Sequence, residues 1–168
     1  KLDLSDKEIE TFSGIAPHFN EHIRKELEKI DQELGVNIYS AGLKIHTTMD
    51  PKVQRILEEA FEKNIKKNQE ILNKEFLSNR SKLKTALNGK NFDIDEITRI
   101  LTENDTIPAE LRDRFLVQGA VVAIDPKNGN ILGMIGGRQE GEYLDLHGFN
   151  RATQAKRQPG SIFKPFIY

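Results

Sequence analysis

The stretch Ala120-Val121-Val122-Ala123-Ile124-Asp125-Pro126-Lys127-Asn128-Gly129-Asn130-Ile131-Leu132-Gly133-Met134-Ile135 carries the clearest strand pattern in the chain. Residues 120–124 form a continuous apolar run, which is typical of a strand buried on both faces. Residues 125–129 hold turn-forming side chains at several positions. Residues 131–135 supply a returning strand. We therefore predict an antiparallel β-hairpin, ended by Gly136-Gly137.

The first 77 residues are mainly of helical type. Residues 18–34 place apolar side chains at helical spacing and stop at Gly35, which predicts a helix. Ser5, with Glu8 three residues later, has the spacing of a capping box for an earlier short helix. Apolar and polar residues alternate over 43–48, which predicts a half-buried strand. Asp50 and Pro51 can then begin a second helix, which continues towards Phe76.

Residues 78–116 are polar and rich in lysine, with a turn expected at Asn88-Gly89. Short helices are indicated after Asp93 and after Ile107-Pro108. We interpret this region as a surface insertion rather than a binding module. The predicted fold class is α+β: a helix–strand–helix segment, a small helical insertion, the hairpin, and the beginning of another helix near Gly160.

Composition excludes several classes of function. The chain has 168 residues, 37% hydrophobic and 30% charged, with a net charge of -1. This balance gives no reason to expect binding to nucleic acid. No cysteine is present, so disulfides and thiolate metal sites are excluded. There is no apolar run of the roughly 20 residues that span a bilayer, and no signal peptide is visible. The first residue is not Met and the last follows an apolar motif, so we expect the sequence to be a fragment of a longer protein.

The pair Ser161 and Lys164 has the spacing of an acyl-transfer site. Serine is a poor nucleophile unless a base takes its proton. A lysine three residues later lies on the same side of a helix, and desolvation lowers its pKa so that the neutral amine can act as the base. Pro165 requires the helix to begin close to Ser161. The apolar residues around the pair can exclude water: Ile162, Phe163, Phe166 and Ile167.

The four-residue pattern alone is weak evidence. A second copy occurs at Ser81-Lys82-Leu83-Lys84, in a lysine-rich stretch where the amine is expected to be solvated. We interpret that copy as a chance match. From the residues alone, a capping serine with an extended lysine is favoured over catalysis at Ser161 too.

Other polar residues give weaker signals. His18 and His22 have a spacing that can bind metal on a helix, but no third ligand and no suitably placed Glu are apparent, so we predict no metal site. His46 is expected on the surface of its strand, and Asp125 is expected to serve the turn. Arg151 and Arg157 are candidates for holding the segment before Ser161 or for meeting a substrate.

The surroundings of Ser161 resemble those of a known family. Arg157-Gln158-Pro159-Gly160-Ser161-Ile162-Phe163-Lys164-Pro165-Phe166 is similar to the active-site block of penicillin-binding proteins, and the segment 149–155 is similar to the stretch before it. Residues 119–137 resemble the hairpin that opens the transpeptidase domain. Ala16-Pro17-His18-Phe19 and the later stretch 42–50 resemble the bifunctional class A members, where this region joins a glycosyltransferase domain to the transpeptidase.

The resemblance implies a function for each part. Residues 1–77 would be the linker between the two enzymatic domains, residues 78–116 an insertion, and residues 117–168 the first part of the transpeptidase domain. Ser161 would attack the D-Ala-D-Ala bond of a peptidoglycan stem peptide, and Lys164 would accept its proton. β-Lactams would acylate Ser161. No metal or cofactor is implied. The parent would work on the outer side of the bacterial cytoplasmic membrane, held there by an N-terminal anchor outside this chain, with other cell-wall assembly proteins as partners.

Two alternatives remain open from the sequence. One is a monofunctional transpeptidase or carboxypeptidase, against which the Ala-Pro-His-Phe block at 16–19 argues. The other is a non-catalytic interaction or pedestal module in which Ser161 only caps a helix. The family's Ser-x-Asn and Lys-Thr-Gly motifs do not occur within these 168 residues, so we expect the isolated chain to be inactive. Unpaired hairpin edges also favour association between copies.

Overall fold

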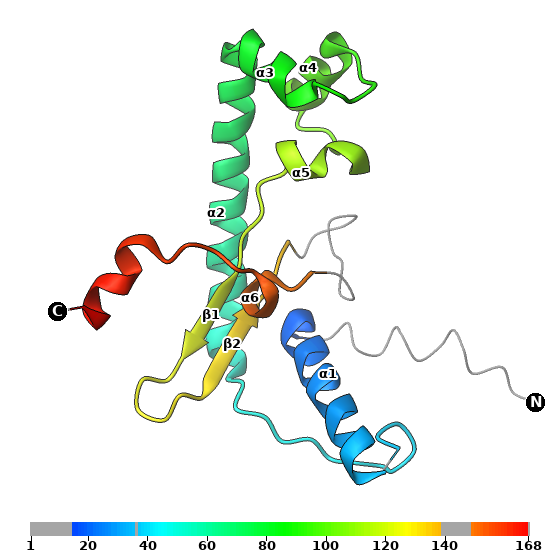
Figure 1. The fold of residues 1–168 in the computed structure, drawn as a ribbon, viewed down its shortest axis with the longest axis vertical. Helices are drawn as coiled ribbons and strands as arrows, with labels where there is room; N and C mark the ends of the chain where they lie inside the picture. Colours follow the sequence, from blue (N-terminus) through cyan, green and yellow to red (C-terminus); the bar gives the residue numbers. More distant parts are fainter. Residues whose placement is uncertain (1–14, 36, 139–148, 168) are drawn as a thin grey trace, which may run out of the picture. The chain divides into compact units, whose positions relative to one another are not determined.

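The computed structural model describes residues 15–35, 37–138 and 149–167 (Figure 1). The contacts separate the chain into two compact units. We call the described part of 1–57 and 120–168 the hairpin unit, and residues 58–119 the helical unit. In chain order the elements are α1 (Pro17–Leu34), α2 (Pro51–Ser78), α3 (Arg80–Leu87), α4 (Ile94–Glu103), η2 (Ala109–Leu111), α5 (Arg112–Phe115), β1 (Val121–Ile124), β2 (Ile131–Ile135), α6 (Arg151–Gln154) and η4 (Gly160–Phe166).

The predicted hairpin is confirmed. β1 and β2 pair antiparallel, with Val122 opposite Met134. The turn depends on Asp125, whose backbone carbonyl accepts the Gly129 N–H at 2.8 Å while its side chain accepts the Lys127 N–H at 2.9 Å. Gly129 has a φ of 78°, a conformation that glycine adopts without strain.

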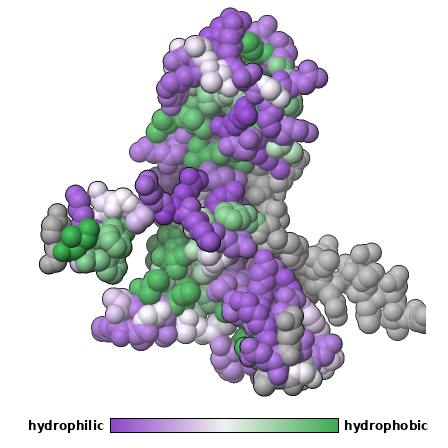
Figure 2. All heavy atoms as spheres, viewed as in Figure 1, coloured by the Kyte–Doolittle hydropathy of each residue, from purple (hydrophilic) through white to green (hydrophobic). Residues whose placement is uncertain are grey.

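The prediction that the first strand is buried on both faces is wrong. β1 is only half-buried and Ile124 is 56% exposed, whereas β2 is buried from Gly133 onwards. Figure 2 shows hydrophobic residues at the surface along the hairpin. The sheet has two strands in the described residues, so β1 is paired along one edge only.

The core of the hairpin unit brings together residues far apart in the sequence. Ala16, Phe19 and Met134 are buried together, and a ring of half-buried apolar side chains packs against them: Ile23, Met49, Val122, Ile131 and Ala152. Gln54, on the first turn of α2, is fully buried. Its side chain accepts the Met134 N–H at 2.8 Å and donates to the Met134 carbonyl at 3.3 Å. This side chain therefore satisfies both backbone groups of Met134 on the side of β2 that faces away from β1.

The strand predicted over residues 43–48 is absent. This segment belongs to no sheet, and Leu43 and Ile45 are 48% and 51% exposed. Two hydrogen bonds join its end to β2: from the Thr48 hydroxyl to the Ile131 carbonyl and from the Asp50 N–H to the Leu132 carbonyl. The alternating pattern fits a strand, but a strand also needs a continuous row of backbone partners, which these two bonds do not supply.

The helix boundaries agree with the local signals. α1 ends at Gly35, whose φ of 65° suits glycine. α2 begins at Pro51, and the Asp50 side chain accepts the Lys52 N–H at 2.8 Å. On α1, Arg24 pairs with both Glu21 and Glu28. Hydrogen bonds that the Arg24 guanidinium donates, first to Glu21 and then to Tyr39, raise its pKa above the ordinary value. The short helix predicted at Ser5 lies outside the described residues.

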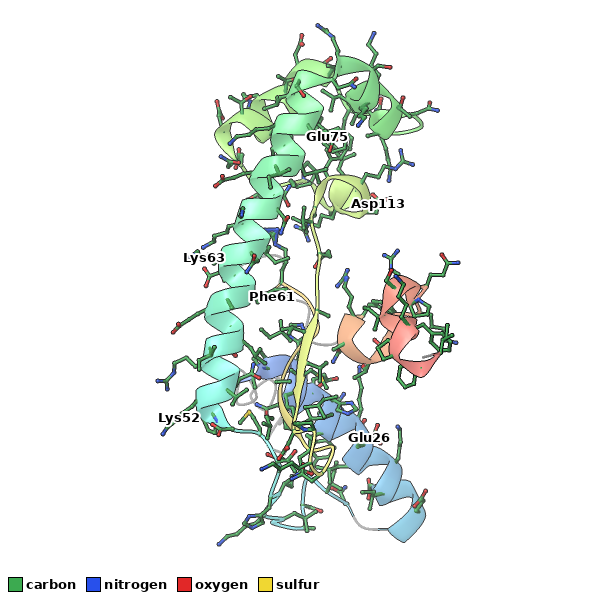
Figure 3. All side chains as sticks on the ribbon, turned by 90° about the vertical axis from the view of Figure 1, so that its left-hand side faces the viewer. Glu26, Lys52, Phe61, Lys63, Glu75 and Asp113 are labelled. Carbon is green, nitrogen blue, oxygen red and sulfur yellow. The ribbon has the colours of Figure 1, made fainter. Side chains whose placement is uncertain are left out.

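The helical unit has a core of its own. Its buried apolar residues come from α2, α3, α4, η2 and α5 and from the chain between them: Ile65, Leu83, Leu87, Ile97, Ile100, Leu101, Ile107, Leu111, Phe115 and Leu116. The Phe76 and Phe115 rings lie 4.7 Å apart. Figure 3 shows Phe61 and Lys63 on opposite sides of α2. Phe61 packs near Gly119, where an added Cβ would come within 3.1 Å of the ring.

Two amides on α2 also support the helical unit. Gln69 donates to the Phe115 carbonyl and accepts the Val117 N–H, at 2.8 and 2.9 Å. The buried Asn73 donates to the Leu101 carbonyl at 3.3 Å. None of the helices in the described part of the chain is long and apolar enough to cross a membrane.

Candidate active site

The segment that carries Ser161 follows α6 within the hairpin unit. The Asn150 side chain accepts the Ala152 N–H at 3.0 Å, which caps this short helix. The Gln154 side chain returns to accept the Asn150 N–H at 2.7 Å. The Arg151 N–H donates to the Gly136 carbonyl at 2.9 Å, just beyond β2. The local signal for this arrangement is an asparagine before a short helical stretch, and our sequence analysis did not single it out.

Gly136 allows this close approach. A Cβ at Gly136 would lie 2.2 Å from the Asn150 Oδ1 and 3.0 Å from the His18 Cδ2. Asn150 itself is 8% exposed, and its Nδ2 lies 3.4 Å from the His18 carbonyl and 3.7 Å from the Met134 sulfur. The end of β2, the start of α1 and the start of α6 therefore meet at one point.

Ser161 and Lys164 lie in η4, a 3₁₀ helix, whereas the sequence predicted the start of an ordinary helix. Pro165 accounts for the difference: it cannot donate the hydrogen bond that an α-helix would direct to the Ser161 carbonyl, and its ring would crowd that carbonyl. A 3₁₀ helix has three residues per turn, so Ser161 and Lys164 still lie on one side. Gly160, at the start of η4, has a φ of 55°.

The expected exclusion of water is not seen. Both Ser161 and Lys164 are exposed. The neighbouring apolar residues are exposed as well, at 79% for Ile162, 51% for Phe163, 80% for Phe166 and 69% for Ile167. The rings of Phe163 and Phe166 contact each other at 5.6 Å, and Figure 2 shows hydrophobic residues on the surface of this segment. The residues around the pair therefore leave the lysine amine solvated.

The second Ser-x-x-Lys copy lies in the helical unit. Ser81 and Lys84 are exposed on α3. Between them, Leu83 is buried and Lys82 pairs with Glu75. Exposure therefore does not distinguish the two copies, and what separates them is the chain around each.

Other candidate residues are placed as follows. The Arg151 guanidinium lies 5.8 Å from the Phe149 ring centroid, while Arg157 is exposed. His18 is buried and His46 is exposed. His147 lies outside the described residues. No group of three or more potential ligands from His, Cys, Asp or Glu occurs in the part of the chain that the structure describes.

The segment that carries Ser161 is similar to known proteins. Residues 119–168 match the penicillin-binding protein transpeptidase domain. The chain is 30% identical over 156 residues to penicillin-binding protein 2D of Bacillus subtilis, covering 91% of this chain and 15% of that protein. It is 53% identical over 55 residues to penicillin-binding protein 1A of Neisseria lactamica and 51% identical over 51 residues to that of Pseudomonas aeruginosa, covering 32% and 30% of this chain.

The chain spans only a small part of these relatives. It covers 15% of the length of the Bacillus protein and 6% of each of the other two. The alignment with the Bacillus protein is long enough to extend beyond residues 119–168. No solved structure is a significant match to this chain.

Proposed function

We propose that Ser161 is the nucleophile of an enzyme that cross-links peptidoglycan, because residues 119–168 match the penicillin-binding protein transpeptidase domain. The family match includes the whole segment from β1 to η4, so it is carried by far more than the four-residue pattern. This match is the observation on which the proposal rests. The exposed second copy at Ser81, outside the matched residues, is assigned no role.

The proposed reaction is a serine acyl transfer. The Ser161 hydroxyl attacks the carbonyl carbon between the two terminal D-Ala residues of a stem peptide, and Lys164 accepts its proton. The terminal D-Ala leaves with a proton, and the remaining peptide stays as an ester on Ser161. An amine from a neighbouring stem then attacks the ester, which forms the cross-link and frees Ser161. A β-lactam acylates the same hydroxyl by opening its own ring.

The proposal requires Lys164 to lose water contact. Removal from water is what allows a lysine amine to serve as a base. In the described residues Lys164 is exposed. The relatives are much longer than this chain, and we propose that further chain of the same domain covers η4 and the apolar side chains around it.

The proposal extends to the organisation of the parent protein. Residues 1–77 are assigned to a linker, 78–116 to an insertion and 117–168 to the transpeptidase domain. The resemblance of residues 16–19 and 42–50 to class A members supports a bifunctional parent with a glycosyltransferase domain before Lys1. The alignment with penicillin-binding protein 2D is also longer than residues 119–168. Such an enzyme would work outside the cytoplasmic membrane, where stem peptides and β-lactams reach it.

Labelling with a fluorescent penicillin tests the proposal. The full-length protein is expected to form a covalent adduct that survives denaturation. Ser161→Ala should abolish the adduct, whereas the matched variant Ser81→Ala should label as the parent does. Equal labelling of Ser161→Ala and the parent would refute the assignment. The 168-residue chain alone should not label, because it lacks the Ser-x-Asn and Lys-Thr-Gly motifs.

A further inference from the structure

We propose that Asn150 is a positioning residue for Ser161, acting by fixing α6 to the start of α1. This inference rests on the proposed function for its catalytic consequence. Its structural part, the attachment of the Ser161 segment to α1, stands on the contacts of Asn150 alone. Asn150 does not touch the reacting atoms; it acts through the chain that connects α6 to η4.

The Asn150 side chain makes two kinds of contact at once. Its oxygen caps α6 through the Ala152 N–H at 3.0 Å. Its nitrogen lies 3.4 Å from the His18 carbonyl in the first turn of α1. A residue that only capped α6 would need the oxygen alone, as serine and aspartate do. The amide nitrogen adds a link to an element that lies 132 residues away in the sequence.

The packing around Asn150 leaves little freedom for α6. Asn150 is 8% exposed. Gly136 lies so close that a Cβ there would sit 2.2 Å from the Asn150 oxygen. The Arg151 N–H is held by the Gly136 carbonyl at 2.9 Å. The position of α6 is thus fixed by both β2 and α1.

Ser161 itself has no comparable support in the described residues. It is exposed, and so are the residues from Thr153 to Gly160 that lead to it. The last buried point before the nucleophile is therefore Asn150. The direction in which the chain leaves α6 sets where η4 can lie, and a displacement of about 1 Å in a reacting group can lower a rate by about a hundredfold.

Two substitutions separate the cap from the link to α1. Asn150→Asp and Asn150→Ser both keep an oxygen for the Ala152 N–H but lose the amide donor that lies 3.4 Å from the His18 carbonyl: the carboxylate has no N–H, and the serine hydroxyl is on a shorter side chain. Asp keeps the side-chain volume and adds a charge, whereas Ser adds no charge and leaves a gap, so a shared effect comes from the lost donor. Asn20→Ala is the matched control, since the Asn20 amide donates to the Ile15 carbonyl just before α1, at 2.9 Å, rather than to α6.

The measurement is the acylation rate constant of the full-length protein with a fluorescent penicillin, obtained at several concentrations to separate binding from acylation. A residue that only stabilises the fold would lower the fraction of molecules that label. A positioning residue lowers the acylation rate constant of the molecules that do label. We expect both Asn150 variants to be slower by about tenfold at an unchanged labelled fraction, with Asn20→Ala unaffected. A parental rate constant in both Asn150 variants would overturn the catalytic part of the proposal.

Hydrogen exchange in the same proteins tests the structural part without any reaction. The amides of η4 should exchange several-fold faster in both Asn150 variants than in the parent and in Asn20→Ala. Unchanged exchange would overturn the attachment to α1. If the parent does not label with penicillin, the proposed function fails, while faster exchange would still support the role of Asn150 in holding η4.

Discussion

The two units of the chain bury their apolar side chains to different extents. The helical unit surrounds Phe115, Ile97 and Leu111 so fully that each is 1% exposed. The hairpin unit centres its main cluster on Ala16, Phe19 and Met134, and it leaves Ile124 and the apolar residues of η4 open. The proposed nucleophile thus lies in the unit with more uncovered apolar surface. We infer that the helical unit is self-sufficient, whereas the described part of the hairpin unit leaves apolar side chains exposed.

In both units, a glutamine side chain of α2 forms hydrogen bonds with backbone groups of another segment. Gln54 bonds both backbone groups of Met134 in the hairpin unit. Gln69 bonds the Phe115 carbonyl and the Val117 N–H in the helical unit. In each case one amide satisfies a donor and an acceptor of passing chain that would otherwise lose hydrogen bonds on burial. The units therefore differ in their apolar packing more than in how α2 supports them.

Substitution of Lys164, the proposed base, gives the largest expected effect. It tests whether acylation depends on residues of the hairpin unit alone. Lys164→Ala in the full-length protein should slow penicillin acylation by about 10² to 10⁴-fold. Lys164→Arg should not restore the rate, because a guanidinium does not give up its proton. Lys84→Ala, in the second Ser-x-x-Lys copy, should leave the rate unchanged. A rate loss for Lys84→Ala equal to that of Lys164→Ala would remove the distinction between the two copies.

Local signals in the sequence predicted most elements of the fold. Each of these signals acts on backbone groups within a few residues, so the nearby sequence is enough to predict its position. Examples are Asp50 with Pro51 at the start of α2, Gly35 at the end of α1, and Asp125 in the hairpin turn. The prediction failed over 43–48, where an alternating pattern lacks a partner strand. The link between Gln54 and Met134 was also missed, since 80 residues separate them and no local pattern shows which backbone groups a buried amide will meet.

The candidate site was predicted in part. The three-residue spacing puts Ser161 and Lys164 on one side of η4 whether the helix is α or 3₁₀, so this placement did not depend on the helix type. Their exposure could not be predicted in the same way, because burial depends on which distant chain covers the segment. The role of Asn150 was missed for the same reason, since its α1 partner precedes it by 132 residues.

Truncation of Phe115 should destabilise the helical unit without abolishing acylation at Ser161. Phe115→Ala removes a ring that is 1% exposed and packed on Phe76 at 4.7 Å. The expected loss is about 3–5 kcal/mol in the free energy of unfolding, measured by urea unfolding of a peptide covering residues 58–119. The control Ile71→Ala, where the side chain is 53% exposed, should change stability by less than about 0.5 kcal/mol. Loss of acylation by Phe115→Ala at parental levels of folded full-length protein would contradict the independence of the two units.

Substitutions of Gln54 and Gln69 test separately how α2 supports each of the two units. Gln54→Leu should leave both backbone groups of Met134 without that partner, and Gln69→Leu should do the same to the Phe115 carbonyl and the Val117 N–H. Each loss is expected to cost about 1–3 kcal/mol. Hydrogen exchange of the Met134 and Val117 amides measures the two effects separately.

Each substitution should accelerate exchange only in its own unit. Asn64→Ala, which removes an exposed amide that bonds within α2 to the Ala60 carbonyl, is the control and should affect neither amide. Equal acceleration of both amides by Gln54→Leu would mean that the units unfold together.

The smallest effect concerns a surface ion pair on α1, in the hairpin unit. Glu26, labelled in Figure 3, accepts a hydrogen bond from Lys29 at 2.6 Å, and this bond lowers the pKa of the Glu26 carboxyl. A carboxyl whose pKa is lower in the folded state adds stability above its unfolded pKa, and that stability is lost as the pH falls through the folded pKa. Lys29→Ala should return the pKa of Glu26 towards its ordinary value, as measured by NMR titration of the side-chain carboxyl. Because the pair is exposed, the thermal stability of the full-length protein at neutral pH should not change measurably; a clear loss would mean that α1 depends on this pair more than on its buried contacts at Phe19.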